Sequence, residues 1–84
     1  MAHILAVDDD RDLCELLKTA LERDGHQVSI LFRGDDVTPQ HCAWADCILL
    51  DIMMPGEDGF STCREIRKFK EIPVIMLFGT RRGV

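Results

Sequence analysis

The sequence predicts an α/β fold in which four parallel strands form one sheet. Short apolar runs alternate with segments whose apolar residues recur at helical spacing, and this alternation is typical of strands joined by crossover helices. Two of the apolar runs lead directly into aspartates, at Asp8 and at Asp51. With 84 residues, of which 46% are hydrophobic, the chain is expected to form one small domain over residues 1–84.

The first strand is expected at residues 4–7, where an apolar run leads into three successive aspartates. Leucines at helical spacing predict a helix over residues 11–24. Asp10 or Asp12 is suited to cap its first turn, and Gly25 follows its last turn at the position that glycine prefers.

The second strand is expected at residues 27–32, which are rich in β-forming residues. A short helix is expected over residues 37–44, with Thr38 as its cap and Pro39 in its first turn. Residues 47–51 form an unbroken apolar run before an aspartate, which predicts a strand buried on both faces.

A third helix is expected over residues 60–69, because its apolar and charged residues separate onto two faces. Ser61 or Asp58 is expected to cap this helix. The apolar run at residues 73–78 predicts the fourth strand.

Asp8, Asp9 and Asp51 all follow strands, and the carboxyl ends of parallel strands meet at one edge of a sheet. Carboxylates brought together there must share a cation or hold protons. Oxygen ligands that are open to solvent suit Mg²⁺, and a carboxylate beside this ion can attack a phosphoryl group. In the alternative interpretation, Asp51 only ends its strand or caps the following turn.

Composition excludes several classes of function. The net charge of −5 argues against nucleic-acid binding, which needs clustered Lys and Arg. No apolar segment is long enough to span a membrane, and no signal peptide is visible. We therefore expect a cytoplasmic protein. The four cysteines have no C-x-x-C spacing and are expected to be reduced rather than metal-bound.

Three segments together resemble the receiver domain of two-component response regulators. They are Val7-Asp8-Asp9, the run Leu49–Gly59 (Leu-Leu-Asp-Ile-Met-Met-Pro-Gly-Glu-Asp-Gly) and Ile72–Leu77. The resemblance implies a flavodoxin-like (CheY-like) sheet with strand order 2-1-3-4 and three helices. It also implies a signalling module rather than an enzyme.

The resemblance further implies the roles of individual residues. Asp51 would accept a phosphoryl group from a histidine kinase or a small acyl phosphate. Mg²⁺ would be bound by Asp9 directly, by Asp8 partly through water, by Asp51 and by the backbone carbonyl of Met53.

The sequence also departs from the receiver pattern. Phe78 stands where the family has Thr or Ser, and the family's last helix, strand and helix, with their lysine, have no counterpart in residues 1–84. A receiver domain truncated in this way would leave an edge strand and an apolar sheet face uncovered. We therefore expect a homo-oligomer, in the simplest case a dimer, formed through the fourth strand or the uncovered face.

Two alternatives to the phosphoacceptor remain open from the sequence. The chain can be an interaction module that derives from a receiver domain and works without phosphorylation. It can also be a fragment of a longer parent protein.

Overall fold

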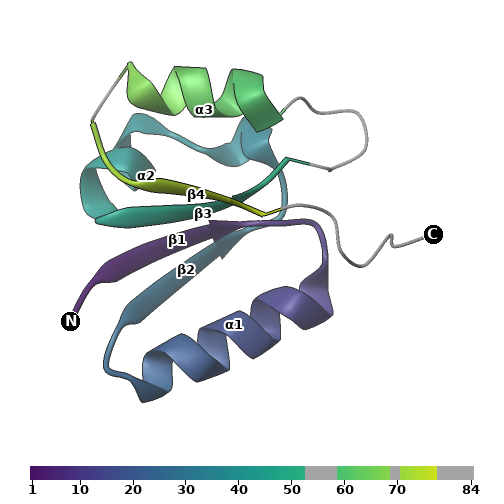
Figure 1. Cartoon of the computed structure of the whole chain (residues 1–84), viewed down its shortest axis with the longest axis vertical. Helices are drawn as coiled ribbons and strands as arrows, with labels where there is room; N and C mark the ends of the chain where they lie inside the picture. Colours follow the sequence, from purple (N-terminus) through teal and green to yellow (C-terminus); the bar gives the residue numbers. More distant parts are fainter. Residues whose placement is uncertain (53–58, 69–70, 78–84) are drawn as a thin grey trace.

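The computed structural model of the chain describes residues 1–52, 59–68 and 71–77. Within these residues, four parallel strands form one sheet in the order β2-β1-β3-β4, which confirms the order expected from the resemblance (Figure 1). The strands are β1 (His3–Val7), β2 (Gln27–Leu31), β3 (Cys47–Asp51) and β4 (Val74–Leu77).

Helices cover both faces of the sheet. Helix α1 (Arg11–Arg23) lies on one face, whereas α2 (Pro39–Trp44) and α3 (Gly59–Arg67) lie on the other (Figure 1). A short 3-10 helix (Gly34–Asp36) follows β2. Every helix in the part of the chain that the structure describes is too short or too polar to cross a membrane.

Side-chain caps explain where the first two helices begin. Asp10 precedes α1 and accepts a hydrogen bond from the Leu13 amide at 3.1 Å. Thr38 precedes α2, and its hydroxyl oxygen accepts a hydrogen bond from the His41 amide at 3.2 Å. These contacts confirm Asp10 and Thr38 as caps. Gly25, just beyond α1, has a positive φ of 89°, as expected of the residue that ends a helix.

The prediction that Ser61 caps the third helix is wrong. Helix α3 begins at Gly59, so Ser61 lies inside its first turn, where its hydroxyl accepts a hydrogen bond from Arg64 at 2.9 Å. Asp58, the other predicted cap, lies outside the described residues.

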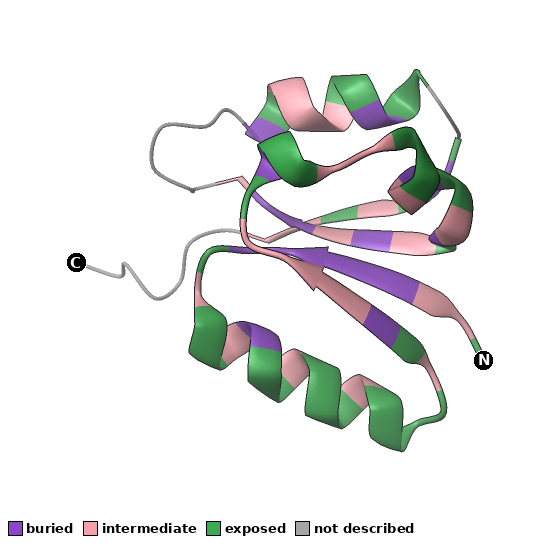
Figure 2. Ribbon diagram, turned by 180° about the vertical axis from the view of Figure 1, so that it is seen from behind, coloured by how far each residue is buried: buried purple, intermediate pink, exposed green. Residues whose placement is uncertain are grey.

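The main hydrophobic core lies between the sheet and the α2–α3 layer. Alternate residues of the two central strands belong to it, and α2 and α3 with their flanking segments supply the rest. Figure 2 shows the buried residues of these elements in purple. Its members are Leu5, Val7, Cys42, Ala45, Ile48, Leu50, Ile66 and Ile72. This layer therefore anchors the two strands that carry the aspartates.

The α1 face of the sheet is less completely covered. Cys47 and Leu49 of β3 are only half-buried, so the prediction that this strand is buried on both faces is wrong. The physical reason is that α1 packs over β2, and no helix among the described residues lies over β3 and β4 on this side (Figure 1). Ile75 of β4 is consequently 52% exposed.

Candidate functional site

Strand register brings Asp8 and Asp51 side by side. Strands β1 and β3 pair in parallel, and their last paired residues are Val7 and Leu50. Asp8 directly follows Val7, and Asp51 directly follows Leu50. Backbone hydrogen bonds hold the chain at this level, because the Asp8 amide donates to the Leu31 carbonyl at 3.0 Å. Asp51 itself pairs with a residue of β4. Both carboxylates are thus attached to the most regular part of the sheet.

The three predicted acids converge at the carboxyl edge of the sheet. Carboxylate oxygens of Asp8, Asp9 and Asp51 all lie within 4.8 Å of one another. Asp8 and Asp51 are buried, with exposed fractions of 1% and 0%, whereas Asp9 is exposed. Two carboxylates at such a separation repel each other by about 3 kcal/mol at an effective dielectric constant of about 20. The cluster therefore favours the binding of a cation.

The three successive aspartates Asp8, Asp9 and Asp10 contribute both to the cluster and to the start of α1. The Asp10 amide donates a hydrogen bond to Asp8 Oδ1 at 2.9 Å, while the Asp10 side chain caps α1. The Cys14 thiol of α1 donates to the Asp8 carbonyl oxygen at 3.3 Å. The start of α1 thus orients Asp8. Cys14 was not predicted as a supporting residue, because a cysteine among the apolar positions of a helix gives no signal of this kind.

The donor set suits Mg²⁺. This ion prefers oxygen ligands and keeps several waters. The three carboxylates supply such oxygens, and these atoms lie within 4.8 Å of one another. The exposed Asp9 leaves room for water ligands and for a phosphoryl group. Met53, the fourth predicted ligand, lies outside the described residues, as does Phe78.

Gly59, the first residue of α3, makes a close contact just behind the site. A Cβ atom at this position would lie 2.5 Å from the Cα of Ile52, the residue after Asp51. Because the obstacle is backbone, the main chain itself would have to move.

A Gly59→Ala variant is therefore expected to lower the free energy of unfolding by about 1–3 kcal/mol. Urea denaturation followed by circular dichroism measures this loss. Arg67→Ala, at an exposed position of the same helix, is the control and should change stability by less than about 0.5 kcal/mol. Equal stability of the two variants would contradict the close approach of α3 to the end of β3.

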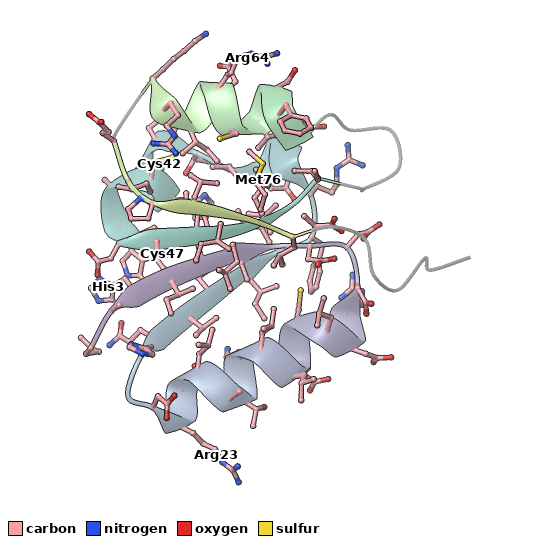
Figure 3. The ribbon with its side chains drawn as sticks, viewed as in Figure 1. His3, Arg23, Cys42, Cys47, Arg64 and Met76 are labelled. Carbon is pink, nitrogen blue, oxygen red and sulfur yellow. The ribbon has the colours of Figure 1, made fainter. Side chains whose placement is uncertain are left out.

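The opposite edge of the sheet carries an aromatic contact. The rings of His3 and Trp44 stack with centroids 4.8 Å apart, and the His3 amide donates to Asp46 Oδ2 at 2.8 Å. His3 and Cys47 mark this edge, where β1 and β3 begin (Figure 3). Because a strand rises about 3.3 Å per residue, Asp51 lies about 13 Å further along β3. Trp44 is therefore poorly placed to report directly on events at the acids.

Fold and site together define a class of protein: a parallel α/β domain with a carboxylate cluster, suited to a divalent cation, at the carboxyl edge of its sheet. The profile of the response regulator receiver domain family matches residues 4–82. The chain therefore belongs to this family, and the resemblance noted in its sequence is confirmed.

Individual relatives agree with this assignment. The transcriptional regulatory protein SpaR of Bacillus subtilis is 46% identical over 77 residues, which are 92% of this chain and 35% of SpaR. The chain thus spans about a third of this relative's length.

Two crystal structures give the same fold. Response regulator TrrA of Thermotoga maritima, in complex with Mg²⁺ and beryllofluoride, is 33% identical with a TM-score of 0.81, over 99% of this chain and 76% of TrrA. The beryllofluoride-activated receiver domain of Klebsiella pneumoniae RstA is 33% identical with a TM-score of 0.79, over 90% of this chain and 66% of that one.

Proposed function

We propose that this receiver domain accepts a phosphoryl group on Asp51 as a signalling step of a two-component system. The observation that carries the proposal is the position of Asp51, which ends the central strand β3 with its carboxylate within 4.8 Å of Asp8 and Asp9. Membership of the receiver family supports it. The domain itself acts as a switch rather than as an enzyme that turns over a separate substrate.

The proposed step is a displacement at phosphorus. A carboxylate oxygen of Asp51 attacks the phosphorus atom, and a new O–P bond forms as the donor's bond breaks. In a histidine kinase the broken bond is the P–N bond of phosphohistidine, and in an acyl phosphate it is a P–O bond. The leaving nitrogen or oxygen keeps the electron pair. The residues around Asp51 need only position the donor and balance its charge.

Charge balance explains why a cation belongs in the proposal. The phosphoryl donor is an anion, and three carboxylates at the site repel it. Asp8, Asp9 and Asp51 would hold Mg²⁺, with the Met53 carbonyl as a further ligand by resemblance to the family. When bound, Mg²⁺ neutralises charge on the transferring group. The relative TrrA forms a complex with Mg²⁺ and beryllofluoride, which supports the binding of Mg²⁺ in this proposal.

Incubation with acetyl phosphate tests the proposal. We expect the intact mass of the chain to increase by one phosphoryl group when Mg²⁺ is present and to stay unchanged when EDTA is added. Peptide mapping should then place the group on Asp51. No modification with Mg²⁺, or modification at another residue, would refute the proposal. A purified histidine kinase, the partner expected from the resemblance, can replace acetyl phosphate as the donor.

A second candidate function is self-association, which the exposed apolar residues on the α1 side of the sheet favour. Leu16 of α1 is 67% exposed and Ile75 of β4 is 52% exposed. Leu49, which pairs with Ile75, is only half-buried. A dimer that covers this face, or that pairs two β4 strands, would remove these side chains from water.

Size-exclusion chromatography with light scattering measures the oligomeric state directly. We expect a dimer at micromolar concentration, and an Ile75→Lys variant should shift it toward monomer because a buried ammonium is costly. A monomeric wild-type chain at this concentration would contradict self-association.

A further inference from the structure

Arg11 directly follows the three successive aspartates Asp8, Asp9 and Asp10 and makes no ion pair within the described residues. It is the first residue of α1, two positions after Asp9, and its side chain is exposed. Its guanidinium carbon lies 4.0 Å from the centroid of the Phe32 ring. A cation–π contact at an exposed site is among the weaker interactions of an arginine. The guanidinium is therefore held near the acids by a contact that it can leave.

Strand pairing explains why Phe32 lies next to the site. Phe32 directly follows β2, and the carbonyl of the preceding Leu31 accepts a hydrogen bond from the Asp8 amide at 3.0 Å. Arg11 reaches the Phe32 ring from α1, which starts immediately after the capping residue Asp10. The stacked pair consequently borders the edge where the three carboxylates converge.

Two other cations in the described residues have acidic partners close by in the sequence. Arg33 Nη2 bonds to Asp35 Oδ2 at 2.8 Å, and Lys68 Nζ bonds to Glu65 Oε2 at 3.0 Å. Lys18 lies seven residues along α1 from Arg11, which is about 10 Å along the helix axis. Arg11 is thus well placed to respond to new negative charge at Asp51.

Phosphorylation would add such charge. With Mg²⁺ bound, the two carboxylates of Asp8 and Asp9 together with a dianionic aspartyl phosphate leave a net charge of about −2. A guanidinium presents a planar fork of donors that fits two phosphate oxygens and is less strongly hydrated than an ammonium. Resting on the function proposed above, we propose that Arg11 leaves Phe32 and binds the phosphoryl group on Asp51.

The proposal makes opposite predictions for the two ligands of the site. Before phosphorylation, Arg11 repels Mg²⁺, whereas during transfer it attracts the phosphoryl oxygens. An Arg11→Gln variant should therefore bind Mg²⁺ as tightly as the wild type or somewhat more tightly, as measured by calorimetric titration. At saturating Mg²⁺ it should be phosphorylated by acetyl phosphate about tenfold more slowly, as measured by intact mass.

Matched variants separate charge from structure. Lys18→Gln removes one positive charge from an exposed position of the same helix and should leave both measurements unchanged. Arg11→Lys should recover part of the rate, because it keeps the charge but loses the planar fork. Phe32→Leu should slow the reaction only a few-fold, because Arg11 keeps its guanidinium but loses the ring that holds it near the site.

The outcomes distinguish this inference from the proposed function. If the wild type and Arg11→Gln are phosphorylated at equal rates, Arg11 has no role and the function of Asp51 stands. If Arg11→Gln loses Mg²⁺ binding as well as rate, its role is structural and the inference is wrong. If the wild type is never modified, the proposed function itself fails.

Discussion

Asp51→Asn is expected to abolish phosphorylation by acetyl phosphate, with a rate reduced at least about a hundredfold. The carboxamide lacks the anionic oxygen that attacks phosphorus, and no described residue holds another carboxylate in the same buried position at the end of β3. Intact mass measured over time gives the rate. Persistent modification of this variant would place the nucleophile elsewhere.

The same substitution should stabilise the fold when Mg²⁺ is absent. Asp51 and Asp8 are both buried beside each other, so removing one charge relieves repulsion of about 3 kcal/mol at an effective dielectric constant of about 20. Part of this energy is lost to rearrangement, and we expect the free energy of unfolding at neutral pH to rise by about 1–2 kcal/mol. Urea denaturation in EDTA measures the change.

Glu15→Gln is the matched control for this stability effect. It also removes one negative charge, but from an exposed position of α1, so it should change stability by less than about 0.5 kcal/mol. Added Mg²⁺ should stabilise the wild type and Glu15→Gln by mass action, and Asp51→Asn much less. An Asp51→Asn variant less stable than the wild type in EDTA would contradict the repulsive cluster.

Leu50→Ala is expected to destabilise the fold by about 2–5 kcal/mol. Leu50 is completely buried in the core between the sheet and α3, and it directly precedes Asp51 on β3. A domain of 84 residues has a total stability of about 4–13 kcal/mol, so the loss is a large fraction of it. Urea denaturation followed by circular dichroism should show a lower midpoint or a chain that no longer folds.

Leu16→Ala provides the comparison, since it makes the same chemical change at a side chain that is 67% exposed. It should cost less than about 0.5 kcal/mol in a monomer. A loss in the range expected for Leu50→Ala would mean that Leu16 is covered by another chain, as in a dimer that covers the α1 side of the sheet. Nearly neutral effects of both substitutions would contradict the assigned core.

Local features of the fold were predictable because short-range chemistry produces them. Asp10 and Thr38 cap their helices because a carboxylate or hydroxyl directly before a helix satisfies its free amides. The prediction failed at Ser61, since a suitable side chain does not show at which residue a helix starts. The order of the strands came from the resemblance rather than from periodicity, because alternation alone does not say which strands are neighbours.

The sequence, with the strand order that the resemblance implies, predicted that Asp8, Asp9 and Asp51 meet, because residues that end neighbouring parallel strands share one edge of the sheet. Only the tertiary structure decided that Arg11 stacks on Phe32. This contact depends on how α1 packs against β2, and contacts between residues far apart in sequence follow from three-dimensional packing that no local pattern encodes.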